Sequence, residues 1–214
     1  MEITHFALIG GGWRAEFYLR IARALPERFA VAGAVLRDPA KASAFGQRWG
    51  VPTYTTLEAL LGATRPAFVV TSVPRDANPA ILDALAARRM PALSETPPAA
   101  GLDDLCRVWA LAEAGARIQV AEQYTYQPHH AARLAFVASG RLGRVSQAQV
   151  SAAHGYHGIS LLRRLLKVRG ETARITSRRF SAPLVAGPDR GGPPAAERLT
   201  TSQQTIAWLD FGDR

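Results

Sequence analysis

The sequence predicts an α/β fold in which a doubly wound parallel sheet is followed by an α+β domain with a mostly antiparallel sheet. Apolar runs typical of buried strands alternate with helical patterns over the first part of the chain. A glycine cluster follows the first apolar run and precedes the first helical pattern. Later strand patterns are longer and alternate between apolar and polar residues. We therefore expect one domain at residues 1–121 and a second at residues 122–214.

In the first domain, strands separated by helices imply right-handed crossovers and hence a parallel sheet. The expected strands cover residues 3–9, 29–36, 53–54, 67–72, 91–94 and 117–123. The expected helices cover residues 15–25, 39–49, 57–61 and 102–114, with a further helix beginning at Asn78. In the last helix, Cys106 shares an apolar stripe with Leu102, Leu105 and Trp109, and we expect this stripe to pack in the core.

The second domain combines helical and strand patterns. The expected helices cover residues 129–139 and 155–167, and the expected strands cover residues 145–153, 173–182 and 199–211. Proline and glycine predict a loop at residues 183–197. An open sheet of three strands leaves an edge unpaired and buries little apolar surface. We therefore expect the natural protein to be longer and this second sheet to be incomplete.

Composition argues against several classes of function. The chain has 214 residues, 48% of them hydrophobic, but no apolar run reaches the length of about 18 residues that suggests a membrane-spanning helix. The formal net charge is +9, yet the arginines are scattered, and Lys41 and Lys167 are the only lysines. We therefore expect no membrane and no nucleic-acid partner, and attribute the charge to an anionic cofactor or substrate. Cys106, the single cysteine, allows no internal disulfide and fits a reducing cytoplasm.

The glycine cluster has the spacing of a dinucleotide-binding turn. Gly10, Gly12 and Ala15 occupy the small-residue positions of the G-x-G-x-x-G/A pattern, between a strand and a helix. Gly10 permits the tight turn, Gly12 lets a pyrophosphate approach the backbone, and Ala15 lets the helix lie close to the strand. The N-terminus of the helix offers N–H groups and a positive dipole end to the phosphates. We therefore expect cofactor binding at Gly10, Gly12, Trp13, Arg14 and Ala15.

Four more stretches accompany this turn: Thr71-Ser72-Val73-Pro74, Ser94-Glu95-Thr96-Pro97-Pro98, residues 139–145 and, more weakly, residues 156–162. In this combination the chain resembles the glucose–fructose oxidoreductase/inositol dehydrogenase/MocA-like (Gfo/Idh/MocA) family. The resemblance implies a Rossmann domain and an NAD(P)-dependent oxidoreductase acting on a sugar, an inositol or a related hydroxy or keto compound. It also implies that Ser72, Pro74 and Glu95 lie at the cofactor. The second-domain sheet is then expected to join copies of the chain into a homo-oligomer.

The chain departs from that family at its acid–base residues. Where the family commonly has Glu-Lys-Pro, this chain has Glu95-Thr96-Pro97, and threonine carries no ammonium group. Where the family has one aspartate four residues before a histidine and another three after it, this chain has Ala153, His157 and Ser160. The candidate catalytic residues are therefore His157, as general acid or base, and Glu95, which places cofactor or substrate.

Three functions remain open at this point. The first is an oxidoreductase with an altered acid–base set, and the second is a non-catalytic dinucleotide-binding relative that acts as a sensor or partner subunit. The third is a lyase or glycosidase that uses bound NAD transiently. His157 itself has two interpretations, a proton-transfer group or a neutral histidine packed on its helix. The His, Cys, Asp and Glu residues have no metal-site spacing, so we expect no metal ion.

The end of the second strand predicts which dinucleotide is preferred. NAD-binding domains usually place an acidic residue there, to bind the ribose hydroxyl groups. In this chain the position is Leu36, which accepts no such hydrogen bond, and Arg37 follows it. Because arginine pairs with a 2′-phosphate, we expect NADP rather than NAD. Asp38 leaves one alternative open, since its carboxylate can cap the next helix or reach the ribose.

Overall fold

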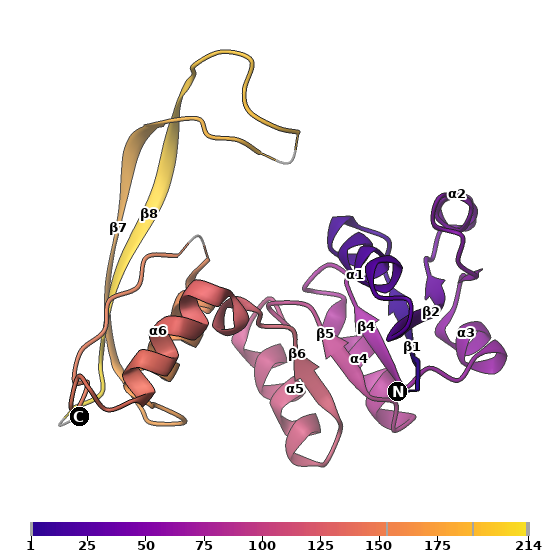
Figure 1. The fold of residues 1–214 in the computed structure, drawn as a ribbon, viewed down its shortest axis with the longest axis horizontal. Coiled ribbons are helices and arrows are strands. Elements are labelled where there is room, and N and C mark those ends of the chain that lie inside the picture. The colour runs from indigo at the N-terminus through magenta and orange to yellow at the C-terminus, as the bar shows by residue number, and fades with distance from the viewer. Residues whose placement is uncertain (1, 153, 190, 213–214) are drawn as a thin grey trace. The chain divides into compact units, whose positions relative to one another are not determined.

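The computed structural model describes residues 2–152, 154–189 and 191–212, and the chain divides into two units. A six-stranded parallel sheet forms the centre of the first unit (Figure 1). The first unit covers residues 1–127 and the second residues 128–214. An antiparallel pair of strands belongs to the second unit. The predicted α/β fold class, with a parallel sheet first and an antiparallel one after it, is confirmed.

The strands of the first unit lie where the apolar runs place them. They are β1 (Thr4–Ile9), β2 (Phe29–Val35), β3 (Thr53–Tyr54), β4 (Phe68–Thr71), β5 (Ala92–Ser94) and β6 (Ile118–Val120). Their order in the sheet is β3-β2-β1-β4-β5-β6, and all neighbours are parallel. The order therefore reverses between β1 and β4. In sheets of this kind, ligands bind beyond the carboxyl ends of the strands at such a reversal.

Helices cover both faces of this sheet. They are α1 (Trp13–Ala24), α2 (Pro39–Trp49), α3 (Leu57–Ala63), α4 (Asn78–Ala87) and α5 (Leu102–Glu113). Leu19 of α1 and Phe45 of α2 belong to one buried cluster, together with Val70 of β4. Leu82 of α4 belongs to a second cluster, together with Val69 of β4. Successive residues of a strand point to opposite faces, so α1 and α2 lie on one side of the sheet and α4 on the other.

The apolar stripe of Leu102, Leu105, Cys106 and Trp109 on α5 does not pack in the core, and this expectation was wrong. Leu102 is 72% exposed and Trp109 65% exposed. Cys106 is exposed as well. The residue that α5 buries is Val108. The helix has apolar residues on two of its sides, and the sheet covers only the side that carries Val108.

The second unit consists of α6 (Pro128–Ala138), α7 (Gly155–Leu166), β7 (Arg174–Val185) and β8 (Leu199–Asp210). The two strands pair along their whole length as a long antiparallel ribbon (Figure 1). The strand expected at residues 145–153 is absent over residues 145–152, and Ala153 lies outside the described residues. Within the described part of the chain, no strand pairs with this segment. Alternating side chains do not make a strand where the backbone has no hydrogen-bonding neighbour.

Neither a membrane span nor a metal site is found among the described residues. No helix there is long and apolar enough to cross a bilayer. No group of three or more His, Cys, Asp and Glu side chains in that part of the chain is arranged to hold a metal ion.

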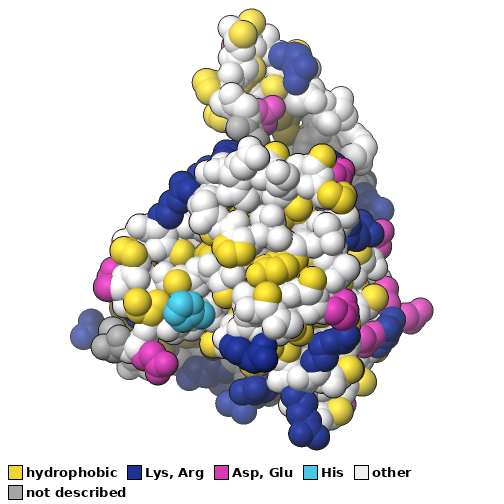
Figure 2. Space-filling model, turned by 90° about the vertical axis from the view of Figure 1, so that its right-hand side faces the viewer, with side chains coloured by type: hydrophobic (Ala, Val, Ile, Leu, Met, Phe, Trp, Pro, Cys, Tyr) yellow, Lys and Arg dark blue, Asp and Glu magenta, His cyan; other side chains and the backbone are white. Residues whose placement is uncertain are grey.

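On the face drawn in Figure 2, Lys and Arg side chains lie at several places, with Asp and Glu side chains among them.

Candidate dinucleotide-binding site

Gly10 forms the tight turn after β1. Its φ is +105°, and a Cβ atom at this position would lie only 2.1 Å from the carbonyl oxygen of Ser72. Its N–H donates a hydrogen bond to the oxygen of Val35, at 2.9 Å. The backbone after β1 therefore passes so close to the end of β4 that only glycine fits. Ser72, expected at the cofactor, is brought against the glycine turn by this contact.

Gly12 has a different environment. It is the N-cap residue of α1 and has no side chain to cap the helix. A Cβ atom added there would meet no atom within 4 Å. Ala15, in the first turn of α1, is fully buried. The backbone at the N-terminal end of α1 is thus open on the side of Gly12, and an anionic pyrophosphate fits such a surface.

Arg14 and Glu95 form a bidentate ion pair in this region. Arg14 Nε donates to Glu95 Oε2 and Arg14 Nη2 donates to Glu95 Oε1, both at 3.0 Å. Tyr18 Oη donates to the same Oε1 at 2.5 Å. The Glu95 side chain is only 12% exposed, so this bidentate pair is largely shielded from water. It ties the first turn of α1 to the end of β5.

Burial raises the pKa of the Tyr18 hydroxyl well above its ordinary value, and the hydrogen bond to Glu95 and the charge of Glu95 raise it further. Tyr18 therefore stays protonated and acts as a donor to the carboxylate. The sequence reasoning did not select Tyr18. A signal was available, because Arg14 and Tyr18 are four residues apart in α1 and share one side of the helix.

Trp13 begins α1 and is 43% exposed. Its ring packs edge-to-face on Phe17, with the ring centroids 4.8 Å apart. The guanidinium carbon of Arg14 lies 5.7 Å from the Trp13 ring centroid and 5.1 Å from that of Phe17. Two aromatic rings thus lie near the guanidinium that Glu95 holds, which restricts the positions that Arg14 can take.

The turn after β2 assigns separate roles to Leu36, Arg37 and Asp38. Leu36 packs against the glycine turn, since a Cβ on Gly11 would meet its Cδ2 at 2.4 Å. The Asp38 carboxylate accepts from the backbone N–H groups of Ala40 and Lys41, at 2.9 and 3.1 Å, and so caps α2. Arg37 is exposed and makes no hydrogen bond or ion pair within the described residues.

Pro74 and Thr96 complete the expected positions in the first unit. Pro74 is exposed, and its oxygen accepts a hydrogen bond from the N–H of Ala77 at 3.1 Å. Thr96 is half-buried and follows Glu95 directly. Neither residue forms part of the Arg14–Glu95 cluster.

His157 belongs to the second unit, in the first turn of α7. It is 5% exposed. The Tyr156 ring lies 4.5 Å from its ring and the His154 ring 6.0 Å, measured between centroids. On this helix Leu161 is buried, whereas Ile159 is 38% exposed. His157 therefore sits on the buried side of α7.

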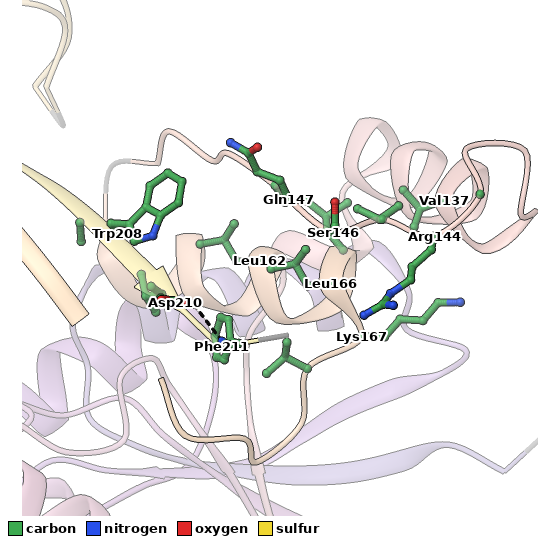
Figure 3. Close-up of a pocket in the computed structure, with 18 residues that line it drawn as sticks. Val137, Arg144, Ser146, Gln147, Leu162, Leu166, Lys167, Trp208, Asp210 and Phe211 are labelled. Carbon is green, nitrogen blue, oxygen red and sulfur yellow. Dashed lines mark hydrogen bonds between the residues drawn. The ribbon is translucent and has the colours of Figure 1, made fainter. Parts of the chain in front are cut away.

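A separate cavity of about 380 Å³ lies within the second unit. Figure 3 shows Leu162 and Leu166 of α7 along one side of it, with Trp208 and Asp210 of β8 at one end. Arg144 and Lys167 also line it. His157 is not among its lining residues.

The sequence model of one family matches most of the first unit. That family is described as an oxidoreductase family with an NAD-binding Rossmann fold, and the match covers residues 4–122, more than half of the chain. The chain belongs to this Gfo/Idh/MocA family. The resemblance stated from the sequence motifs is thereby confirmed, and with it an NAD-binding Rossmann domain. No curated protein matches the chain.

Solved structures of other proteins share this fold. The WlbA dehydrogenase of Chromobacterium violaceum, determined with NADH and UDP-GlcNAcA, has a TM-score of 0.69 and 17% identity over 84% of this chain and 59% of its own. GenD2 from gentamicin A biosynthesis, determined with NAD, has a TM-score of 0.70 and 20% identity over 100% of this chain and 64% of its own. The myo-inositol 2-dehydrogenase of Lactobacillus plantarum has a TM-score of 0.66 and 13% identity over 86% and 60%. The chain thus spans less than two thirds of the length of these Gfo/Idh/MocA-like structures.

Proposed function

We propose that this protein is an NAD(P)-dependent oxidoreductase that transfers hydride between a nicotinamide and a hydroxyl or keto carbon of a sugar-like or inositol-like compound. The observation that carries the proposal is the turn at Gly12, open beside the N-terminus of α1 at the point where the strand order reverses. Family membership supports it. The substrate class is supported by the UDP-GlcNAcA held by one similar structure and by the inositol dehydrogenase activity named for another.

In this proposal, separate residues bind the cofactor and transfer the proton. A nicotinamide cofactor, when bound, supplies the carbon that gives or takes the hydride. The turn at Gly10 and Gly12 receives the pyrophosphate, and Arg37 pairs with the 2′-phosphate of NADP. His157 gives or takes the hydroxyl proton. Glu95 is occupied by Arg14 and Tyr18, so it positions the site and does not move the proton.

The experiment that tests this function has two steps. The purified chain, and the natural protein if it is longer, are first titrated with NADPH and NADH by calorimetry. The absorbance of the reduced nicotinamide is then followed with a panel of polyols, inositols, sugars and sugar nucleotides. We expect binding and a substrate-dependent change in absorbance. Absence of binding at millimolar cofactor would refute the proposal.

One observation favours a second candidate, a non-catalytic dinucleotide-binding subunit. Thr96 has no ionisable group, and the only carboxylate beside it in sequence, Glu95, is committed to an ion pair. A protein of this kind would bind NADPH with ordinary affinity and leave its absorbance unchanged with every substrate of the panel. The two steps of the experiment therefore separate the two candidates.

The second unit supports an accompanying proposal of homo-oligomerisation. The strands β7 and β8 expose large apolar side chains, among them Ile206 at 67% and Trp208 at 63%. Exposed apolar side chains on a two-stranded sheet are commonly covered by a partner surface. We infer that a second copy of the chain covers them.

A further inference from the structure

The side chain of Asn78 joins the two ends of the segment that carries Glu95. Asn78 is the first residue of α4 and is 3% exposed. Its Nδ2 donates one hydrogen bond to Ser94 Oγ at 2.9 Å and another to the oxygen of Pro98 at 2.7 Å. One buried amide nitrogen thus fixes residues 94–98 from both ends.

The backbone of Glu95 is held between these two contacts and β4. Ser94 Oγ, which accepts from Asn78, donates to the oxygen of Glu95 at 3.2 Å. The N–H of Glu95 donates to the oxygen of Thr71 at 3.0 Å. The backbone of Glu95 is therefore fixed by hydrogen bonds, and its side chain extends from there to Arg14. A continuous chain of hydrogen bonds runs from α4 through the end of β5 to α1.

In the Asn78 amide, only the nitrogen has hydrogen-bond partners among the described residues. Within the described residues, Asn78 Oδ1 is buried and has no hydrogen-bond partner. An unsatisfied buried acceptor lowers stability, and buried polar groups of this kind are uncommon in folded proteins. The donor side of the amide is used twice and the acceptor side not at all. Both hydrogen bonds of the Asn78 side chain therefore go to residues 94–98.

We propose that Asn78 is a positioning residue of the dinucleotide site, which keeps residues 94–98 in the one arrangement where Glu95 holds Arg14 at the first turn of α1. Asn78 acts through Ser94 and Glu95 and needs no contact with the cofactor. The inference rests on the proposed function, because the cofactor is what the first turn of α1 would meet. The inference assigns a positioning role to Asn78 of α4, which the motif of the glycine turn does not predict.

The first test compares three variants at a temperature where circular dichroism shows each of them folded. Asn78→Asp keeps the shape and removes both N–H donors, and Glu95→Gln weakens the ion pair directly. Leu60→Ala is the matched control, because it opens a cavity at a fully buried residue of α3 outside this network. We expect NADPH to bind Asn78→Asp and Glu95→Gln about tenfold more weakly, the factor that loss of one good hydrogen bond gives. Leu60→Ala should bind like the wild type.

A second measurement needs no cofactor. In the wild-type protein, the Arg14 Nε–H should give a ¹H–¹⁵N resonance that exchanges slowly with water, because it is hydrogen-bonded to a shielded carboxylate. We expect this protection to be lost in Asn78→Asp and kept in Leu60→Ala.

The outcomes separate this inference from the proposed function. If Asn78→Asp keeps the Arg14 protection, or binds NADPH as the wild type does while merely melting earlier, Asn78 is only a structural residue and the inference is overturned. If the wild type binds no dinucleotide, the proposed function is refuted. The resonance still shows in that case whether Asn78 fixes Arg14, and loss of protection in Asn78→Asp would support that part.

Discussion

Gly10 and Gly12 lie two residues apart in one turn, yet only one of them is required by the fold. A side chain at Gly10 would strike the Ser72 carbonyl and would sit at a positive φ, whereas a side chain at Gly12 would point into open space. The spacing pattern already predicts different roles, the tight turn for Gly10 and the approach of a pyrophosphate for Gly12. The close contact at Gly10 and the open space at Gly12 support the proposal that Gly10 serves the turn and Gly12 the phosphates.

Gly12→Val should therefore abolish NADPH binding and leave the melting temperature close to that of the wild type. Gly10→Ala should lower stability by about 1–2 kcal/mol from the left-handed backbone alone, with the clash at Ser72 adding to this. Calorimetric titration and thermal denaturation of both variants check the pair. Undiminished binding by Gly12→Val would contradict the assignment of the phosphate site.

His157 is buried among aromatic rings, so its replacement needs two variants. His157→Ala and His157→Asn should both reduce turnover by about a hundredfold to ten-thousandfold, the usual range for a lost general acid or base. Their affinity for NADPH should remain near that of the wild type. Steady-state rates and titrations measure the two quantities. A variant with nearly full turnover would show that His157 only packs on its helix.

Tyr18 gives the protein a specific response to alkaline pH. Its pKa is raised by burial and by Glu95, so the folded state holds the phenolic proton more tightly than the unfolded state. Its contribution is therefore complete below about pH 10, the ordinary tyrosine value, and is lost as the pH rises above it. Tyr18→Phe should be less stable near pH 7 by about 1.5–3 kcal/mol, the range for a hydrogen bond to a charged group. The difference in melting temperature should shrink above pH 10; a constant difference would count against the Tyr18–Glu95 hydrogen bond.

At the scale of the elements, the turn between β2 and α2 places a carboxylate that caps a helix next to an exposed arginine. The Asp38 carboxylate accepts hydrogen bonds from two backbone N–H groups of α2, and Arg37 beside it is exposed. The alternative in which Asp38 binds the ribose of NAD competes with this cap. The observed cap supports the preference for NADP.

Arg37→Ala and Asp38→Ala form a matched pair for this preference. Arg37→Ala should weaken NADPH binding by about tenfold or more and leave NADH binding nearly unchanged, because only NADPH carries the 2′-phosphate. Asp38→Ala should cost about 0.5–2 kcal/mol of stability through the lost cap and keep the ratio of the two affinities. Titration with both cofactors and thermal melts decide the matter. Equal losses for NADPH and NADH in Arg37→Ala would refute the assignment.

At the scale of the whole molecule, the β7–β8 ribbon is the surface on which assembly is proposed. Ile206 and Trp208 are two residues apart in β8 and therefore point to the same face of the ribbon. Phe180 of β7 is paired with Gln204, which is two residues before Ile206, so Phe180 shares this face. Leu199 pairs with Val185 and lies on the opposite face. Both faces expose apolar side chains, so the two faces are altered in separate variants.

The double variant Ile206→Lys with Trp208→Lys should sediment as a monomer, because like charges on both copies oppose contact of this face. Leu199→Lys, on the other face and 72% exposed, should sediment as the wild type does. Sedimentation velocity on the three proteins measures this. A wild-type protein that is already monomeric at high concentration would refute assembly of this chain through the ribbon.

The sequence by itself determined where the strands and helices of the first unit lie along the chain, and it determined the turn at Gly10 and Gly12. These features depend on side-chain period and on backbone freedom, which neighbouring residues express locally. The same local patterns were ambiguous at α5, where two apolar stripes compete and only the one with Val108 is covered. They were misleading at residues 145–152, because a strand depends on a partner that alternation does not reveal.

Only the tertiary structure decided what surrounds the glycine turn. Arg14 and Glu95 are 81 residues apart in the chain, and nothing local to either residue indicates the other. Asn78 likewise meets Ser94 and Pro98 only because β4 and β5 are neighbours in the sheet. Periodicity shows which residues form a strand, but the order of strands brings side chains from separate segments to the same edge. The glycine turn could therefore be predicted from the sequence, whereas the network that holds Arg14 beside it could not.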